Sequence, residues 1–292
     1  MDITLALGGG GAKGNAHIGV IRRLEKEGYK IRAVAGTSYG GIVAVLYALG
    51  YPPNVIQTIF EEVDQNRLYG HTSSDGPSLL GIAGVREFLE RILGNRTFND
   101  VRIPCALTAV DVNTGGEVML ADGRLVDAVL ATIALPGIFP VQRLNGWDLV
   151  DGGVLNPVPV TLARGLKPDL PVVAVVLNDP IDLPVRAYSI PVPGILPRPI
   201  AERIARISLA QSLDIFLRSV DISSRSVAHL RLALDKPEVI IRPDVHEFGL
   251  LDKVVVADLA QRGEEAVENV LPELKRAVSW SSRLARRVFG AN

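Results

Sequence analysis

One serine of the chain is flanked by glycines in a pattern that is typical of nucleophilic serines. Ser38 belongs to Gly36-Thr37-Ser38-Tyr39-Gly40, which matches G-x-S-x-G. An apolar run, 31–35, precedes it, and a helical pattern, 40–49, follows. On a sharp turn between strand and helix, such a serine projects its hydroxyl above the sheet edge, where it can attack a carbonyl carbon. The alternative is a serine that caps the helix in a glycine-rich turn.

The residue that would activate this hydroxyl is a second question, because a serine needs an adjacent base. Asp151 follows a short strand pattern, 148–150, and precedes two glycines that remove steric bulk beside the carboxylate. His229 and His246 fit the chain order of α/β-hydrolases formally, but no signature surrounds either of them. Asp-Gly is also a common turn. The residues alone favour Asp151 and leave the histidines open.

Four consecutive glycines, 8–11, follow the first apolar run of the chain. Glycine amides beside a helix N-terminus suit an anion, either a bound phosphate or a transient oxyanion. A P-loop requires Ser or Thr after its lysine, whereas Gly14 follows Lys13 here. The dinucleotide pattern G-x-G-x-x-G is present, but residues 30–36 contain no acid for a ribose. An oxyanion site is the interpretation that the nearby Ser38 favours.

The elements that must position these residues alternate between strand and helix patterns. Continuous apolar runs are typical of strands covered on both faces. Alternation of the two patterns predicts an α/β fold of three layers, α/β/α, with a mostly parallel central sheet. The expected strands are 3–7, 31–35, 103–110, 117–120, 148–150, 172–177 and 239–241, and helices are expected at 14–27, 40–49 and 200–232.

The segment 179–199 carries six prolines, a density that disfavours regular structure. With the helix that follows, residues 179–233 are expected to form a loop-helix lid or cover region. The tail, 276–292, is basic, and its apolar residues recur at helical spacing. Such a helix either packs on the domain or lies on an anionic membrane. The main domain is expected to span residues 1–275.

Composition and charge exclude several classes of function. The 292 residues carry a formal net charge of −1, which gives no footprint for nucleic acid. Cys105 is the only cysteine, so neither a disulfide framework nor a cysteine metal cluster is expected. The chain starts without a signal-peptide pattern and contains no apolar run of membrane-spanning length. We expect a cytoplasmic protein, with peripheral membrane contact left open and the oligomeric state unknown.

The order of these motifs resembles the bacterial, single-domain type of the patatin-like phospholipase family. GGGxKG, GxSxG and DGG follow one another as in that family over about residues 1–270. Further stretches agree: AHIGV at 16–20, ALPGIFP at 134–140, NPVP at 156–159 and VIIRPDVHEFGLL at 239–251. The resemblance implies the fold shared by patatin and the FabD/lysophospholipase-like proteins.

What the resemblance implies for the site is a Ser38–Asp151 dyad with an oxyanion hole from Gly9, Gly10 and Gly11. Lys13 occupies the family's basic position, where it either attracts a lipid phosphate or orders the loop. Tyr39 replaces a residue that is small in many relatives and is expected either to narrow the substrate pocket or to alter the acyl-chain preference.

The implied reaction is hydrolysis of a phospholipid, lysophospholipid or glyceride ester without metal or other cofactor. An acyltransferase with the same nucleophile and a non-catalytic phosphate- or nucleotide-binding module are the alternatives.

Overall fold

The computed structural model describes residues 1–65, 68, 78, 80–184 and 200–279, with the side chains of 200–213 excepted. Eight strands of this part form one sheet in the order β5-β6-β3-β2-β1-β7-β8, and β4 also pairs with β3. The strands are β1 (Asp2–Leu7), β2 (Lys30–Thr37), β3 (Cys105–Asp111), β4 (Gly116–Leu120), β5 (Gln142–Leu144), β6 (Trp147–Asp151), β7 (Val172–Val175) and β8 (Val239–Ile241).

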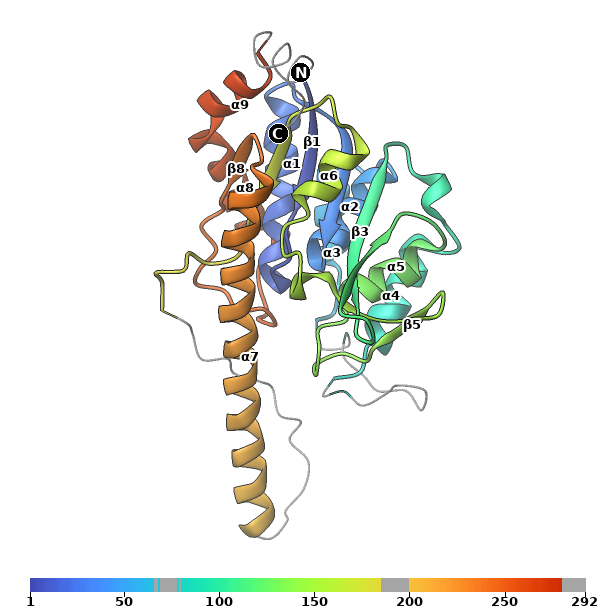
Figure 1. Ribbon diagram of the computed structural model, residues 1–292, viewed down its shortest axis with the longest axis vertical. Coiled ribbons are helices and arrows are strands. Elements are labelled where there is room, and N and C mark those ends of the chain that lie inside the picture. Colours follow the sequence, from blue (N-terminus) through green and yellow to red (C-terminus); the bar gives the residue numbers. More distant parts are fainter. Residues whose placement is uncertain (66–67, 69–77, 79, 185–199, 280–292) are drawn as a thin grey trace.

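Helices cover both faces of this sheet (Figure 1). The α-helices are α1 (Ala16–Lys26), α2 (Tyr39–Ala48), α3 (Pro53–Glu61), α4 (Ala83–Leu93), α5 (Leu125–Thr132), α6 (Val160–Leu166), α7 (Ile200–Asp235), α8 (Val256–Asn269) and α9 (Leu271–Ala277). Short 3-10 helices are η1 (Gly11–Asn15), η2 (Phe98–Asp100) and η3 (Gly152–Val154).

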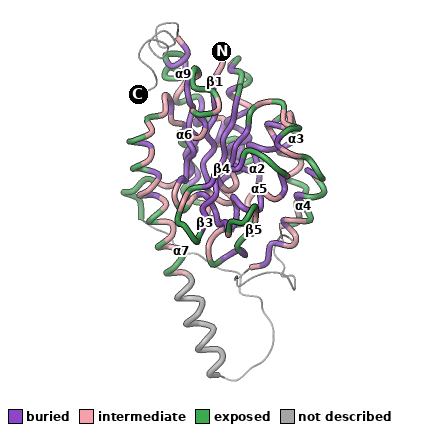
Figure 2. The backbone as a smooth tube through the Cα atoms, turned by 45° about the vertical axis from the view of Figure 1, so that its right-hand side comes forward, coloured by how far each residue is buried: buried purple, intermediate pink, exposed green. Residues whose placement is uncertain are grey.

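Buried residues are concentrated along the strands of the sheet, as Figure 2 shows. Along β1, Ile3, Leu5 and Leu7 belong to the larger cluster, which α1, α2, α5 and α8 also supply. Ala6 points to the opposite face, where it packs with residues of α6 and with Leu232 of α7. Alternate residues of one strand therefore serve two apolar layers, which confirms the three-layer α/β/α fold.

The sheet is parallel over β3, β2, β1, β7 and β8 and antiparallel at β4, β5 and β6. The predicted fold class is confirmed, and the antiparallel strands at one end make the sheet mixed. All seven predicted strands are present, with ends shifted by a few residues, and the predicted helices at 14–27, 40–49 and 200–232 correspond to α1, α2 and α7. Most of the predicted proline-rich segment, 185–199, and the tail 280–292 lie outside the described residues.

Candidate active site

Two strands that end at the same place on β3 bring the predicted nucleophile and base together. Thr37, the last residue of β2, pairs with Thr108, and Asp151, the last residue of β6, pairs with Ala109. β4 pairs with both of these β3 residues, so it occupies the other edge of β3. β2 and β6 therefore share one edge and meet end to end, which places Ser38 beside Asp151.

The backbone of Ser38 adopts a conformation that few residues other than glycine adopt. Its φ of 55° and ψ of −129° turn the chain sharply from β2 into α2. The Ser38 amide donates to Thr132 Oγ1 at 2.9 Å, and the Thr132 hydroxyl donates to the Thr108 carbonyl at 2.6 Å. Thr132 thus holds the strained turn from α5, and the Ser38 side chain makes no helix-capping bond.

The hydroxyl of Ser38 and the carboxylate of Asp151 form a direct hydrogen bond. Ser38 Oγ donates to Asp151 Oδ2 at 2.6 Å, and the Gly153 amide donates to Asp151 Oδ1 at 2.7 Å. Both carboxylate oxygens are therefore engaged, which fixes the plane of the group. Burial raises the pKa of Asp151 to about 6, although the Ser38 and Gly153 hydrogen bonds oppose the rise. The carboxylate is thus basic for an aspartate and ionised at neutral pH.

The histidines that the structure describes do not take the base position. His246 is exposed and pairs with Asp244, and His229 is exposed on α7. His17 is fully buried, and its Nε2 lies 2.8 Å from the carbonyl of Gly8. Desolvation lowers the pKa of His17 to about 4, so the ring is neutral and donates to that carbonyl. His17 thereby anchors the carbonyl of Gly8 at the start of the glycine loop.

The predicted oxyanion glycines differ from one another in how their amides are used. The Gly9 amide donates to the Pro157 carbonyl at 2.9 Å, so this expected donor is already engaged. On the other side, the Ala12 amide donates to the Leu250 carbonyl at 2.9 Å. These two bonds bracket Gly10 and Gly11, which both line the cavity above Ser38. The oxyanion hypothesis is therefore narrowed to the amides of Gly10 and Gly11.

The two predicted substrate-contact residues both line the cavity, and both have partners within the protein. Lys13 Nζ donates to Asp179 Oδ1 at 2.8 Å, and both side chains are 8% exposed. Tyr39 donates its hydroxyl to Asn15 Oδ1 at 2.7 Å, and its ring centroid lies 5.2 Å from that of Phe60. This geometry favours the loop-ordering role for Lys13 and a wall position for Tyr39.

A cavity of about 700 Å³ opens over the Ser38–Asp151 pair. Its walls are mainly apolar and come from segments far apart in the chain. They include Ile42, Phe60, Val63, Leu68, Leu80, Val85, Phe88, Ile133, Leu135, Phe139, Leu177, Leu250 and Val254. A concave apolar space beside a small polar cluster is the usual form of a site for an organic ligand. No group of three or more His, Cys, Asp or Glu residues that could hold a metal ion occurs among the described residues.

The motifs did not predict the roles of several residues that support the site. Thr132 and Asp179 belong to no recognised pattern, although Thr132 lies two residues before the stretch 134–140 that the resemblance includes. Asn156, in the NPVP stretch, accepts the Thr37 hydroxyl on its carbonyl at 2.9 Å and donates its side-chain amide to Glu117 at 2.7 Å. These bonds depend on the packing of the sheet, which local sequence does not encode.

Comparison with known proteins found a matching family model and several relatives. Residues 5–164 match the family model described as patatin-like phospholipase. An uncharacterized NTE family protein of Mycobacterium tuberculosis is 34% identical over 184 residues, which cover 60% of this chain and 49% of that protein. A second from the same organism is 28% identical over 282 residues, which cover 94% of this chain and 48% of that protein. The chain thus spans about half the length of these relatives.

The overall architecture also resembles that of a solved structure. The crystal structure of VipD from Legionella pneumophila matches with a TM-score of 0.56 at 12% identity, covering 93% of this chain and 66% of that one. At this identity the likeness concerns the fold alone. The family model covers more than half of the chain, starting within β1 and ending within α6, and the matched range includes Ser38 and Asp151. The chain belongs to the patatin-like phospholipase family.

Proposed function

We propose that this protein is a serine acyl hydrolase that cleaves carboxylic ester bonds in lipids, with Ser38 as nucleophile and Asp151 as its base. The observation that carries the proposal is the 2.6 Å hydrogen bond from Ser38 Oγ to Asp151 Oδ2 at the floor of an apolar cavity. Family membership makes a lipid ester the substrate class with the strongest support.

In the first step, Ser38 Oγ attacks the ester carbonyl while Asp151 Oδ2 accepts the hydroxyl proton. An Oγ–C bond forms, and the carbonyl oxygen becomes an oxyanion. A base with a pKa of about 6 suits this role, because it is ionised at neutral pH yet binds a proton more readily than an exposed aspartate. The Gly153 amide on Oδ1 leaves Oδ2 directed at the serine.

The oxyanion is assigned to the amides of Gly10 and Gly11. These residues line the same cavity as Ser38, and an ideal Cβ at the preceding Gly9 would lie 3.2 Å from Ser38 Cβ. Fixed amide dipoles that face the developing charge stabilise the tetrahedral intermediate without reorganisation. The 3-10 helix η1 begins at Gly11, with Gly10 as its N-cap residue.

The intermediate then collapses, the bond to the leaving alcohol breaks, and Asp151 returns its proton to the departing oxygen. An acyl group remains on Ser38, with its hydrocarbon chain in the apolar cavity. Water next attacks the acyl-enzyme, and Asp151 accepts the proton of the water. The fatty acid leaves, and Ser38 regains its hydroxyl as Asp151 is deprotonated again.

A panel of phospholipids, lysophospholipids and glycerides, read by mass spectrometry for released fatty acid, tests the proposal. We expect hydrolysis of at least one class by the wild type and a loss of roughly 10³-fold or more in kcat for Ser38→Ala and Asp151→Asn. His246→Ala is the matched control, because this exposed histidine also pairs with an aspartate, and should leave kcat unchanged. A fully active Asp151→Asn enzyme would overturn the dyad.

A further inference from the structure

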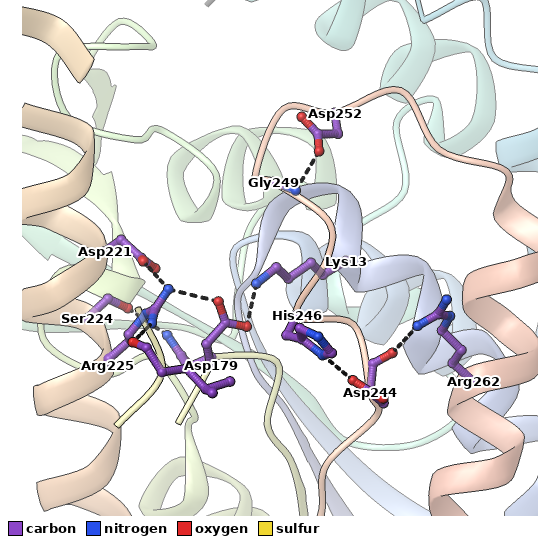
Figure 3. A network of polar contacts seen from close by, with 12 residues as sticks. Lys13, Asp179, Asp221, Ser224, Arg225, Asp244, His246, Gly249, Asp252 and Arg262 are labelled. Atoms are coloured by element: carbon purple, nitrogen blue, oxygen red, sulfur yellow. Dashed lines mark hydrogen bonds and ion pairs between the residues drawn. The ribbon is translucent and has the colours of Figure 1, made fainter. Parts of the chain in front are cut away.

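A buried chain of four charged side chains connects the glycine loop to α7 (Figure 3). Lys13 Nζ lies 2.8 Å from Asp179 Oδ1, and Arg225 Nη2 lies 2.8 Å from Asp179 Oδ2. The same Arg225 atom lies 2.6 Å from Asp221 Oδ2, one turn earlier in α7. The Arg225 side chain is only 4% exposed. One carboxylate therefore holds two cations that come from different elements.

The position of Asp179 follows from the sheet. β7 lies beside β1 in parallel, so the segments after both strands emerge at the same edge. Asn178 and Asp179 both contact α7: Asn178 Nδ2 donates to Ser224 Oγ at 2.9 Å, next to the Arg225 ion pair. The glycine loop in turn packs on this segment, because an ideal Cβ at Gly10 would lie 2.9 Å from Leu177 Cβ.

The glycine loop has anchors on each side of the amides assigned to the oxyanion. Before Gly10, the His17 ring donates to the Gly8 carbonyl, and the Pro157 carbonyl accepts from the Gly9 amide. Beyond Gly11, the Leu250 carbonyl holds the Ala12 amide, and Asp179 holds Lys13. Lys13 lies two residues after Gly11 within η1, so the ion pair of its side chain holds the short turn that follows these amides.

We propose that Asp179 is a positioning residue, which fixes the Gly10 and Gly11 amides for oxyanion stabilisation by pairing Lys13 with Arg225 of α7. The proposal rests on the proposed acyl hydrolase function. The α7 turn at 219–224 lines the same cavity as Ser38, so the helix that covers the substrate also supports the catalytic loop. The network is formally neutral, with two cations and two carboxylates. Removal of Asp179 would take from the buried Lys13 ammonium the carboxylate with which it pairs, whereas Arg225 would keep Asp221.

The test compares Asp179→Asn with a matched control, Glu238→Gln. Glu238 also pairs with an arginine, Arg164, at 2.9 Å with partly buried side chains, but it accepts the amide of Val172 at the start of β7, the end of the strand remote from Ser38. We expect Asp179→Asn to lower kcat for a short p-nitrophenyl ester by about 10- to 100-fold with KM changed less than about threefold. Glu238→Gln should lower Tm and leave kcat at the wild-type value.

The Lys13→Met variant and the double variant Lys13→Met/Asp179→Asn complete a mutant cycle. Because the two residues act as a unit, the double variant should lose no more kcat than Asp179→Asn alone. Hydrogen exchange of peptides covering residues 8–24 gives a readout that needs no activity, and Asp179→Asn should accelerate exchange at Ala12 to Asn15. A wild-type kcat combined with unchanged exchange in Asp179→Asn would overturn the positioning role.

Failure of the proposed function is distinguishable from failure of this inference. A wild type that hydrolyses no ester, with exchange at Ala12 to Asn15 accelerated in Asp179→Asn, would overturn the hydrolase proposal and support the coupling between α7 and the loop. An active wild type whose Asp179→Asn variant loses only Tm, as the Glu238→Gln control does, would overturn the coupling alone.

Discussion

At the scale of single residues, the site depends on one carboxylate whose environment changes its chemistry. Asp151 is buried beneath the cavity, and desolvation raises its pKa to about 6 against two hydrogen bonds that lower it. Ser38 and Gly153 supply those bonds and direct one oxygen at the nucleophile. The same burial that makes the base effective opposes folding above the pKa, because the charged form is poorly solvated.

The raised pKa of Asp151 predicts the pH dependence of the reaction. Asp151 must be ionised to accept the serine proton, so kcat/KM should rise with pH, reach half its maximum near pH 6 and level off by about pH 8. A pH series with a short p-nitrophenyl ester measures this profile. A half-maximum near pH 4, the ordinary range of an aspartate, would contradict the assigned environment.

The same pKa predicts a stability effect of opposite sign to the activity effect. Between about pH 4 and 6 the unfolded chain loses its Asp151 proton while the folded protein keeps it, so rising pH lowers the free energy of unfolding. From the shift of about two units, the loss reaches at most about 3 kcal/mol above pH 6. Asp151→Asn should therefore unfold at a higher Tm than the wild type at pH 8 and at a similar Tm at pH 4. A lower Tm at pH 8 would contradict this prediction.

At the scale of elements, the turn from β2 to α2 requires close approach of backbones. An ideal Cβ at Gly36 would lie 2.5 Å from Gly41 Cα and 2.6 Å from the Gly40 carbonyl oxygen. At Gly40 it would lie 2.4 Å from the Leu7 carbonyl oxygen, where β1 gives way to the glycine loop. The glycines of G-x-S-x-G thus let the nucleophile turn pack against its own helix and against the neighbouring loop.

Gly36→Ala is predicted to be strongly destabilising, because backbone atoms of Gly40 and Gly41 must move to admit the methyl group. The expected loss in the free energy of unfolding is about 3 kcal/mol or more, at the upper end for single substitutions. Gly165→Ala in α6 is the matched control, since nothing lies within 4 Å of its ideal Cβ, and it should raise stability by about 0.5–1 kcal/mol. Urea denaturation followed by circular dichroism measures both, and a Gly36→Ala variant as stable as the wild type would refute the packing argument.

The sequence predicted this part of the fold well because its signals are local. The apolar runs predicted β1, β2 and α2, and the glycine pattern predicted that Ser38 lies on the turn between β2 and α2. The residues around Asp151 favoured it as the base without excluding the histidines, and its pairing with Ser38, 113 residues away, was implied by the resemblance. Its structural cause, the meeting of β2 and antiparallel β6 on one edge of β3, depends on long-range pairing. For the same reason the use of the Gly9 amide by Pro157 and the ion pair of Lys13 with Asp179 could not be read from the motif.

At the scale of the whole molecule, the cavity is assembled from both halves of the chain. Residues of α2, α3 and α4 form apolar wall, the loop around Leu250 closes the side next to Gly11, and the 219–224 turn of α7 covers another side. A volume of about 700 Å³ is sufficient for a long acyl chain. No helix of the described residues is both long and apolar enough to cross a bilayer.

The apolar wall predicts that filling the cavity will change acyl-chain preference. Val85 of α4 lines the cavity and is 9% exposed, so Val85→Trp should shorten the accessible space. At about 0.8 kcal/mol for each methylene left in water, kcat/KM for a dodecanoyl ester should fall about tenfold more than for a butanoyl ester. Val112→Trp is the control, because this residue is 50% exposed and lies outside the cavity wall. An equal fall for both esters would show that acyl chains bind elsewhere.

The most direct test of the Ser38–Asp151 dyad is covalent labelling with a fluorophosphonate, mapped by peptide mass spectrometry. The probe bonds to a serine oxygen only where a base activates that oxygen and an oxyanion site accepts the phosphonyl oxygen. We predict a single adduct on the peptide containing Ser38 in the wild type, and a rate of labelling at least about 100-fold lower in folded Asp151→Asn. A folded wild type that remains unlabelled at Ser38, or an Asp151→Asn variant labelled at the wild-type rate, would contradict the account.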